Sequence, residues 1–181
     1  MKKKIFIIGS NSFSGSNMIN YLLNKKFKVL GVSRSKEPKD IFLPYKTNSN
    51  KNFVFKKLDL NKDVSKIILL IKKFKPQYII NYASQSMVTE SFKNSEQWYK
   101  TNILSQIKLF NFLCKNKSLK KYIHFSTPEV YGNTKKWIKE NNDFNPTTPY
   151  AISRAACDMH LRTLYKEFNF PVLFTRAANV Y

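Results

Sequence analysis

Short apolar runs recur along this sequence, and stretches with helical spacing separate them. A strand that is buried on both faces reads as a continuous apolar run, as in a parallel sheet with helices on both sides. The alternation therefore predicts an α/β fold, a doubly wound parallel sheet of about six strands. The expected strands are Ile5–Ile8, Lys28–Val32, Asn52–Lys57, Tyr78–Ile80, Tyr122–Phe125 and Pro171–Thr175.

Helical spacing fills most of the intervals between these runs. A first helix is expected after Gly15, and three further helices are expected over Val64–Phe74, Ser95–Cys114 and Pro149–Phe168. Residues 36–51 are rich in Lys, Pro, Asn and Ser, which is typical of a surface loop.

The sequence carries 32 basic and 11 acidic residues, a formal net charge of +21. Clustered cations attract nucleic acid. Here, however, the lysines are scattered, and the arginines that usually read bases and phosphates are only Arg34, Arg154, Arg162 and Arg176. We therefore expect no nucleic-acid partner, although a general attraction for anionic substrates remains.

Cys114 and Cys157 show neither CxxC nor metal-ligand spacing, so we expect two reduced thiols and no metal site. The apolar run near the start is too short for a signal peptide, and no run approaches the length of a membrane span. These features predict a cytoplasmic protein without a membrane partner.

The segment Gly9–Gly15 joins the first strand to its helix. Glycine lets the backbone approach a pyrophosphate, and the free amides at a helix start attract its charge. A plain strand-to-helix turn is the alternative interpretation.

The second strand is followed by Ser33, Arg34 and Ser35, without the carboxylate that usually binds the ribose hydroxyls of NAD. The guanidinium of Arg34 is suited to a 2′-phosphate, which favours NADP over NAD. Alternatively, Arg34 is a solvated loop residue.

Polar side chains follow the strand Tyr122–Phe125, at the end where open α/β sheets bind their ligands. Farther on, Tyr150 and Arg154 lie four residues apart in a helical pattern and share one face of that helix. A cation in that position favours the phenolate, which a tyrosine base requires.

These residues resemble the extended short-chain dehydrogenase/reductase family (NAD-dependent epimerases and dehydratases), and most closely its sugar-nucleotide 4,6-dehydratases. The family pattern is Ser/Thr-x-Glu-Val-Tyr-Gly, followed by Tyr-x-x-x-Lys. Thr127, Glu129 and Tyr150 match it, whereas Arg154 stands at the lysine position. Pro128 stands where many members carry an acidic or hydroxyl residue that helps the leaving hydroxyl depart.

The resemblance implies a Rossmann fold from which the substrate domain is largely absent, so that residues 1–181 form the N-terminal part of a longer enzyme. It implies a cofactor site for NADP or NAD made of Gly9, Ser12, Phe13, Ser14, Gly15, Ser33, Arg34, Asp59, Leu60, Ala83, Ser84, Thr101, Tyr150 and Arg154. Ser12 replaces the middle glycine of the family's GxxGxxG turn, and Asp59 is equally suited to cap a helix. Ser86, Thr127 and Asn179 would contact a nucleotide-sugar substrate.

For the reaction, the resemblance implies a 4,6-dehydratase of the GDP-mannose or dTDP-glucose type that acts through a 4-keto intermediate. The catalytic residues would be Thr127, Glu129, Tyr150 and Arg154, and relatives dimerise through the helices at 95–114 and 149–168. An epimerase or decarboxylase of the same family is an alternative. A non-catalytic NAD(P)-binding domain is another, because Arg154 and Pro128 depart from the pattern.

Overall fold

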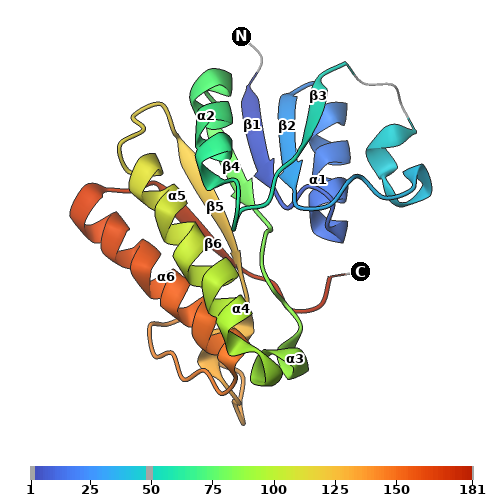
Figure 1. Cartoon of the computed structure of the whole chain (residues 1–181). Helices are drawn as coiled ribbons and strands as arrows, with labels where there is room; N and C mark the ends of the chain where they lie inside the picture. Colours follow the sequence, from blue (N-terminus) through green and yellow to red (C-terminus); the bar gives the residue numbers. More distant parts are fainter. Residues whose placement is uncertain (1–2, 48–50, 181) are drawn as a thin grey trace.

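A computed structural model describes residues 3–47 and 51–180 of the chain. Six strands form one all-parallel sheet in the order β3-β2-β1-β4-β5-β6 (Figure 1). This order reverses beside β1, which pairs with β2 on one side and with β4 on the other. The strands are β1 (Lys4–Ile8), β2 (Lys28–Ser33), β3 (Phe53–Lys57), β4 (Tyr78–Asn81), β5 (Lys121–Ser126) and β6 (Val172–Arg176).

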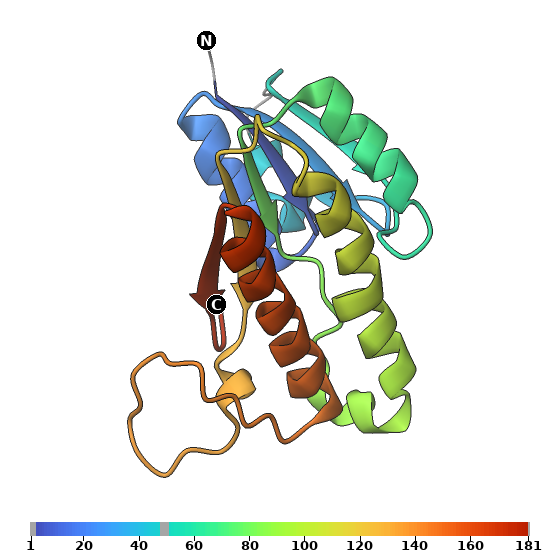
Figure 2. The ribbon, with the colours of Figure 1, turned by 90° about the vertical axis from the view of Figure 1, so that its left-hand side faces the viewer.

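Helices cover both faces of the sheet (Figures 1 and 2). One face packs against α2 (Val64–Phe74), α5 (Ser105–Leu113) and α6 (Pro149–Phe168), and the other packs against α1 (Phe13–Asn24). The shorter elements are the 3₁₀ turns η1 (Asp40–Phe42), η2 (Pro44–Lys46) and η4 (Pro128–Tyr131), the helices α3 (Val88–Lys93) and α4 (Ser95–Tyr99), and the π-helical segment η3 (Lys100–Leu104).

Two apolar clusters form the core, one on each face of the sheet. Successive side chains of a strand point to opposite faces, so Phe6 and Ile8 enter the larger cluster while Ile5 and Ile7 enter the smaller one. The doubly wound parallel sheet is confirmed, and each predicted strand lies within one residue of the observed bounds at either end.

The predicted surface loop 36–51 is wrong in part, because η1 and η2 lie within it. Leu43 and Tyr45 of this segment are buried against α1, and the Tyr45 hydroxyl donates a hydrogen bond to Glu37 (2.7 Å). Residues 48–50 of the predicted loop lie outside the described residues. Two buried apolar side chains thus hold a lysine-rich and proline-containing segment on the sheet.

The helix expected over Ser95–Cys114 is present as α4, η3 and α5, with the π-helical segment in its middle. A π segment widens one turn of the helix and often occurs at functional sites. None of the described helices combines the length and apolar composition that crossing a bilayer requires.

Candidate active site

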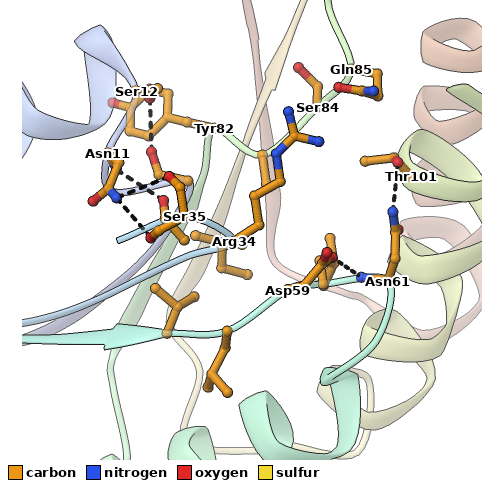
Figure 3. A pocket seen from close by; sticks show the side chains of 17 residues that line it. Asn11, Ser12, Arg34, Ser35, Asp59, Asn61, Tyr82, Ser84, Gln85 and Thr101 are labelled. Carbon is orange, nitrogen blue, oxygen red and sulfur yellow. Dashed lines mark hydrogen bonds between the residues drawn. The ribbon is translucent and has the colours of Figure 1, made fainter. Parts of the chain in front are cut away.

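A first cleft of about 290 Å³ opens at the carboxyl ends of β1, β2 and β4, where the strand order reverses (Figure 3). Open α/β sheets bind nucleotides at this point. The predicted cofactor residues that line this first cleft are Gly9, Ser12, Ser33, Arg34, Asp59, Leu60, Ala83, Ser84 and Thr101.

The turn after β1 requires a glycine at its first position. Gly9 has a φ of +82°, and a Cβ there would lie 2.7 Å from the backbone nitrogen of Ala83. Ser12 is the N-cap of α1: its hydroxyl accepts a hydrogen bond from the Gly15 amide (3.0 Å) and donates one to the Gly9 carbonyl (2.8 Å). The serine at the middle-glycine position therefore stabilises the helix start.

Asn11, which sequence reasoning missed, holds the loop after β2 beside this turn. Its side-chain amide donates to the carbonyls of Ser35 (3.1 Å) and Lys36 (2.9 Å), and its backbone amide donates to the Ser33 hydroxyl (3.0 Å). Arg34, between these anchored residues, extends its guanidinium into the first cleft toward Ser84 (Figure 3). The polar side chain within the glycine turn was the available signal for Asn11.

Asp59 lies on the far wall of the first cleft and caps no helix. Its carboxylate accepts a hydrogen bond from the Asn61 amide (2.8 Å). The side-chain amide of Asn61 in turn donates to the Thr101 hydroxyl in η3 (2.9 Å) (Figure 3). This connection between the β3–α2 loop and the π-helical segment fixes one wall of the first cleft.

A second cleft of about 390 Å³ adjoins the first, because Ser12, Tyr82 and Ser84 line both. It brings together predicted residues from four segments of the chain: Ser14, Ser86, Tyr150 and Arg154 of α6, and Asn179. Tyr82 was not predicted from the sequence. Burial raises the pKa of Tyr82 to about 12, so it remains a neutral phenol at physiological pH.

Other predicted residues line neither cleft. Thr127 is buried, and its hydroxyl accepts a hydrogen bond from the Glu129 amide (3.3 Å), which caps η4. Glu129 follows Pro128 in that turn. Phe13 is largely exposed at the start of α1, and Gly15 is buried within it.

Hydrogen bonds fix the first turn of α6, which carries Tyr150. The Tyr150 amide donates to the Ser91 hydroxyl (3.1 Å), and its carbonyl accepts from the Ser153 hydroxyl (2.7 Å). Buried Asn102 in η3 donates to Ser153 (2.9 Å) and exchanges two hydrogen bonds with the backbone of Gln85. The π-helical segment therefore joins α6 to the loop that separates the two clefts.

Arg154 lies one turn after Tyr150 and is almost fully buried. Its guanidinium donates a hydrogen bond to the Phe125 carbonyl and lies 3.4 Å from the ring nitrogen Nε2 of His124. The Arg154 cation is therefore held under the carboxyl end of β5, at the wall of the second cleft. Among the described residues, no three His, Cys, Asp or Glu side chains gather as a metal site requires.

A family model described as GDP-mannose 4,6 dehydratase matches residues 6–181, almost the whole of the chain. The chain belongs to this family. The family predicted from the Thr-x-Glu-Val-Tyr-Gly and Tyr-x-x-x-Arg residues is therefore confirmed.

Among relatives in sequence, dTDP-D-glucose 4,6-dehydratase of Dictyostelium discoideum is 35% identical over 201 residues, covering 99% of this chain and 44% of that protein. Among solved structures, dTDP-glucose 4,6-dehydratase from Bacillus anthracis in complex with NAD is 26% identical with a TM-score of 0.82. It is matched over 99% of this chain and 56% of its own.

UDP-N-acetylglucosamine 4-epimerase from Methanobrevibacter ruminantium is similar in structure as well, at 28% identity with a TM-score of 0.85, over 100% of this chain and 56% of its own. The chain thus spans about half the length of the family members that it matches.

Proposed function

We propose that this chain is the dinucleotide-binding part of an NAD(P)-dependent sugar-nucleotide 4,6-dehydratase. The main support is the second cleft, which sets Tyr150 and Arg154 directly beside the cleft at the switch point of the sheet. The dehydratases among the relatives support the same activity.

The first cleft fits a dinucleotide. Gly9 keeps the turn free of a side chain, and the start of α1 directs backbone amides toward the position of a pyrophosphate. Gly9, Ser12, Asp59, Leu60, Ala83 and Thr101 would hold NAD(P), which supplies the hydride acceptor for the reaction.

Arg34 favours NADP over NAD in this cleft. Ser33 and Ser35 flank Arg34, and Asn11 forms a hydrogen bond with each of them. The backbone at Arg34 is therefore fixed, and its guanidinium is preorganised for a 2′-phosphate. Arg34→Ala should weaken NADP binding at least about tenfold and leave NAD binding nearly unchanged, as measured by calorimetry. Lys36→Ala is the control; an equal loss for both cofactors would contradict the preference.

In the reaction, Tyr150 takes the proton from the sugar hydroxyl that is oxidised at carbon 4. The charge of Arg154, one helical turn away, stabilises the resulting phenolate. Ser86 and Asn179 line the same cleft and are placed to contact the nucleotide sugar.

The ketone at carbon 4 acidifies the proton at carbon 5, and Glu129 is the base that removes it. Thr127 polarises the carbon 4 oxygen in this scheme. Because Pro128 has no acidic hydrogen, Glu129 also returns a proton to the hydroxyl that leaves carbon 6, or a water molecule does so. Carbon 6 would then take back the hydride that carbon 4 had given up and carbon 5 would take a proton, so that the net change is the loss of one water. Both residues must turn toward the second cleft from their positions in and before η4.

Mass spectrometry of the protein with a panel of nucleotide-linked hexoses, with NAD and NADP supplied separately, tests this function. A product lighter by one water from one sugar is the expected result, and Tyr150→Phe should abolish it. Bound cofactor without any product would contradict the proposal and favour a non-catalytic NAD(P)-binding domain.

An epimerase of the same family is the second candidate, supported by the 4-epimerases among the similar structures. The same panel, extended with nucleotide-linked hexuronic acids and analysed by chromatography as well as by mass, separates the two, because an epimerase yields an isomer of unchanged mass that only chromatography distinguishes from the substrate. Loss of carbon dioxide from a hexuronic acid would identify a decarboxylase instead.

We also propose a cytoplasmic homodimer that forms through the helix pair. Leu104 in η3, next to α5, and Ile152 and Met159 on α6 expose large apolar side chains, which is consistent with an interface. Cys114 and Cys157 are unpaired, as a reducing compartment allows.

A further inference from the structure

A buried ion pair lies beneath the second cleft, between α6 and β6. The carboxylate of Asp158 is fully buried, and the guanidinium of Arg176 lies 2.7 Å from its Oδ2 atom. Ser126 donates a hydrogen bond to the same oxygen (2.8 Å), and the Nε2 atom of His124 lies 3.3 Å from Oδ1. The Oδ2 atom therefore faces a guanidinium and a hydroxyl donor, whereas Oδ1 has only the nearby His124 ring and no hydrogen-bond partner in the described part of the chain.

Aromatic rings hold Arg176 in this position. The guanidinium carbon lies 5.7 Å from the ring centre of Tyr131 and 5.6 Å from those of Phe144 and Phe174. Rings on three sides restrict the rotamers of Arg176 and stabilise its charge. Arg176 is therefore already oriented toward Asp158 by groups that belong to neither cleft.

His124 completes this cluster as a neutral ring. Burial lowers the pKa of His124 and is the largest cause; Asp158 opposes this effect, and the charges of Arg154 and Arg176 act in the same direction as burial. The Nδ1 atom has no hydrogen-bond partner in the described part of the chain, whereas Nε2 lies 3.3 Å from Asp158 Oδ1 and 3.4 Å from the Arg154 guanidinium. The neutral ring can therefore donate from Nε2 to Asp158 or accept there from Arg154, depending on its tautomer. Burial alone would raise the pKa of Asp158, but His124, Arg176 and Ser126 together lower it, so Asp158 is ionised.

This arrangement leaves Arg154 without a carboxylate partner. Asp158 lies four residues after Arg154 on the same helix, the spacing at which an ion pair normally forms. Within residues 3–47 and 51–180, however, no ion pair of 4 Å or less involves Arg154, and Arg176 occupies the carboxylate instead. The charge of Arg154 is balanced by no acidic side chain at the wall of the second cleft.

We propose that Arg176 is a positioning residue that neutralises Asp158 and thereby reserves the charge of Arg154 for an anion in the second cleft, in particular the Tyr150 phenolate. This inference rests on the proposed function, because it takes Tyr150 as the base. Arg176 itself lines neither the first nor the second cleft. The titratable and charged groups around Tyr150 and Arg154 are Tyr82, Tyr122, His124, Cys157, Asp158 and Arg176.

Carbon-13 NMR of tyrosine-labelled protein tests the proposal, because it counts the phenolate of Tyr150 without turnover. The spectrum of Tyr150→Phe assigns the signal. In Arg176→Gln, Asp158 is released to capture Arg154, and the phenolate fraction of Tyr150 at a given pH should fall about tenfold.

Arg162→Gln is the matched control. Arg162 also lies over the rings of Phe144 and Phe174, at 4.5 and 5.9 Å, but makes no ion pair with Asp158 in the described structure. This variant should leave the phenolate fraction of Tyr150 within about twofold of the unmodified protein.

A rescue separates a charge effect from a structural one. Asp158→Asn combined with Arg176→Gln removes both members of the pair and should restore the phenolate fraction, because nothing remains to capture Arg154. Melting curves verify that each variant is folded. If Arg176→Gln does not fold, the double variant and Asp158→Asn are compared instead. Neither of these two should lower the phenolate fraction of Tyr150.

An unchanged titration in Arg176→Gln, or a double variant as impaired as the single one, would overturn the inference. A protein that shows these titration changes but releases no water from any sugar would contradict the proposed function alone. If the protein releases water from a sugar but Arg176→Gln leaves the titration of Tyr150 unchanged, only the role of Arg176 is contradicted.

Discussion

At the scale of the residue, Ser12 shows how a departure from the family turn can be accommodated. Its hydroxyl satisfies the Gly15 amide at the start of α1, which a glycine could not do. Such caps usually stabilise a helix by about 1 kcal/mol, and replacement by glycine costs less than replacement by alanine. The serine at position 12 takes more space than the family's glycine beside the proposed pyrophosphate site, but it makes the start of α1 more stable.

We expect Ser12→Ala to lower the free energy of unfolding by about 1 kcal/mol and Ser12→Gly to lower it by only about 0.3 kcal/mol. Urea denaturation measures both values. Ser14→Ala, two residues on, is the control, because Ser14 is not the cap. Equal losses for the alanine and glycine variants at position 12 would show that the cap does not contribute.

His124 gives the fold a dependence on pH. Burial lowers the pKa of His124 in the folded protein, so the unfolded chain binds a proton first as the pH falls below about 6.5. The stability that the neutral ring provides is complete above that pH and is lost at lower pH, by up to about 1.4 kcal/mol per pH unit.

His124→Gln, whose side-chain amide can still donate to Asp158, should flatten this dependence in denaturation curves between about pH 7 and 5. Burial lowers the pKa of His160 as well, but this ring is only partly buried, so His160→Asn should have the smaller effect. A wild-type protein that is equally stable at both pH values would refute the expectation.

At the scale of the element, the π-helical segment η3 carries Asn102, which connects the loop after β4 to α6. Asn102 makes three hydrogen bonds, to both backbone groups of Gln85 and to Ser153. Asn102 and Ser153 are fully buried, and Gln85 is partly buried. The widened turn therefore determines the position of the loop after β4 relative to α6.

Asn102→Leu keeps the branch at Cγ but is larger and leaves several polar groups unpaired, so we expect it to lower the free energy of unfolding by about 2–4 kcal/mol. Thr101→Val, one position earlier, removes a single half-buried hydrogen bond to Asn61 and should cost about 1 kcal/mol. Guanidinium denaturation of both variants provides the comparison. If Asn102→Leu lowers the free energy of unfolding no more than Thr101→Val does, Asn102 does not hold the loop after β4 against α6.

The strands were predictable because buried parallel strands consist largely of short apolar runs, and each of these runs is followed by polar or turn residues. The π segment was not, since one extra residue in a turn leaves no change in hydrophobic period. Leu43 and Tyr45 were missed because the apolar residues of this segment are few and are surrounded by lysines and prolines, which is typical of a loop.

The sequence motifs also located most residues of the two clefts, because those residues follow strand ends or begin helices. Asp158 and Arg176 were missed as a pair. They lie on different elements, and no spacing rule connects a helix carboxylate with a guanidinium on a later strand. Only the packing of α6 against β6 brings them together.

At the scale of the whole molecule, the net charge of +21 has few internal partners. Lysine–carboxylate pairs in the described residues are limited to Lys46–Glu37, Lys66–Asp63 and Lys93–Glu90. Most basic side chains therefore repel one another across the surface, which opposes the compact state.

We expect the melting temperature to rise when sodium chloride increases from about 10 to 150 mM, because the screening length falls from about 30 to 8 Å. Replacing the exposed Lys135, Lys136 and Lys139 by glutamine should weaken this response. Calorimetry at each salt concentration measures it. A melting temperature that falls with salt would mean that attractive surface pairs outweigh the repulsion.

The central place of β1 has a consequence for how the chain folds during synthesis. Lys4, at the start of β1, donates a hydrogen bond to Gln77, 73 residues later, just before β4. At a translation rate of about 5–20 residues per second, Gln77 is synthesised about 4–15 s after Lys4, and one edge of β1 stays unpaired for that time. An apolar strand edge exposed for that time is a target for chaperones and for premature association. We therefore expect the nascent sheet to remain prone to aggregation until β4 has been synthesised and pairs with β1.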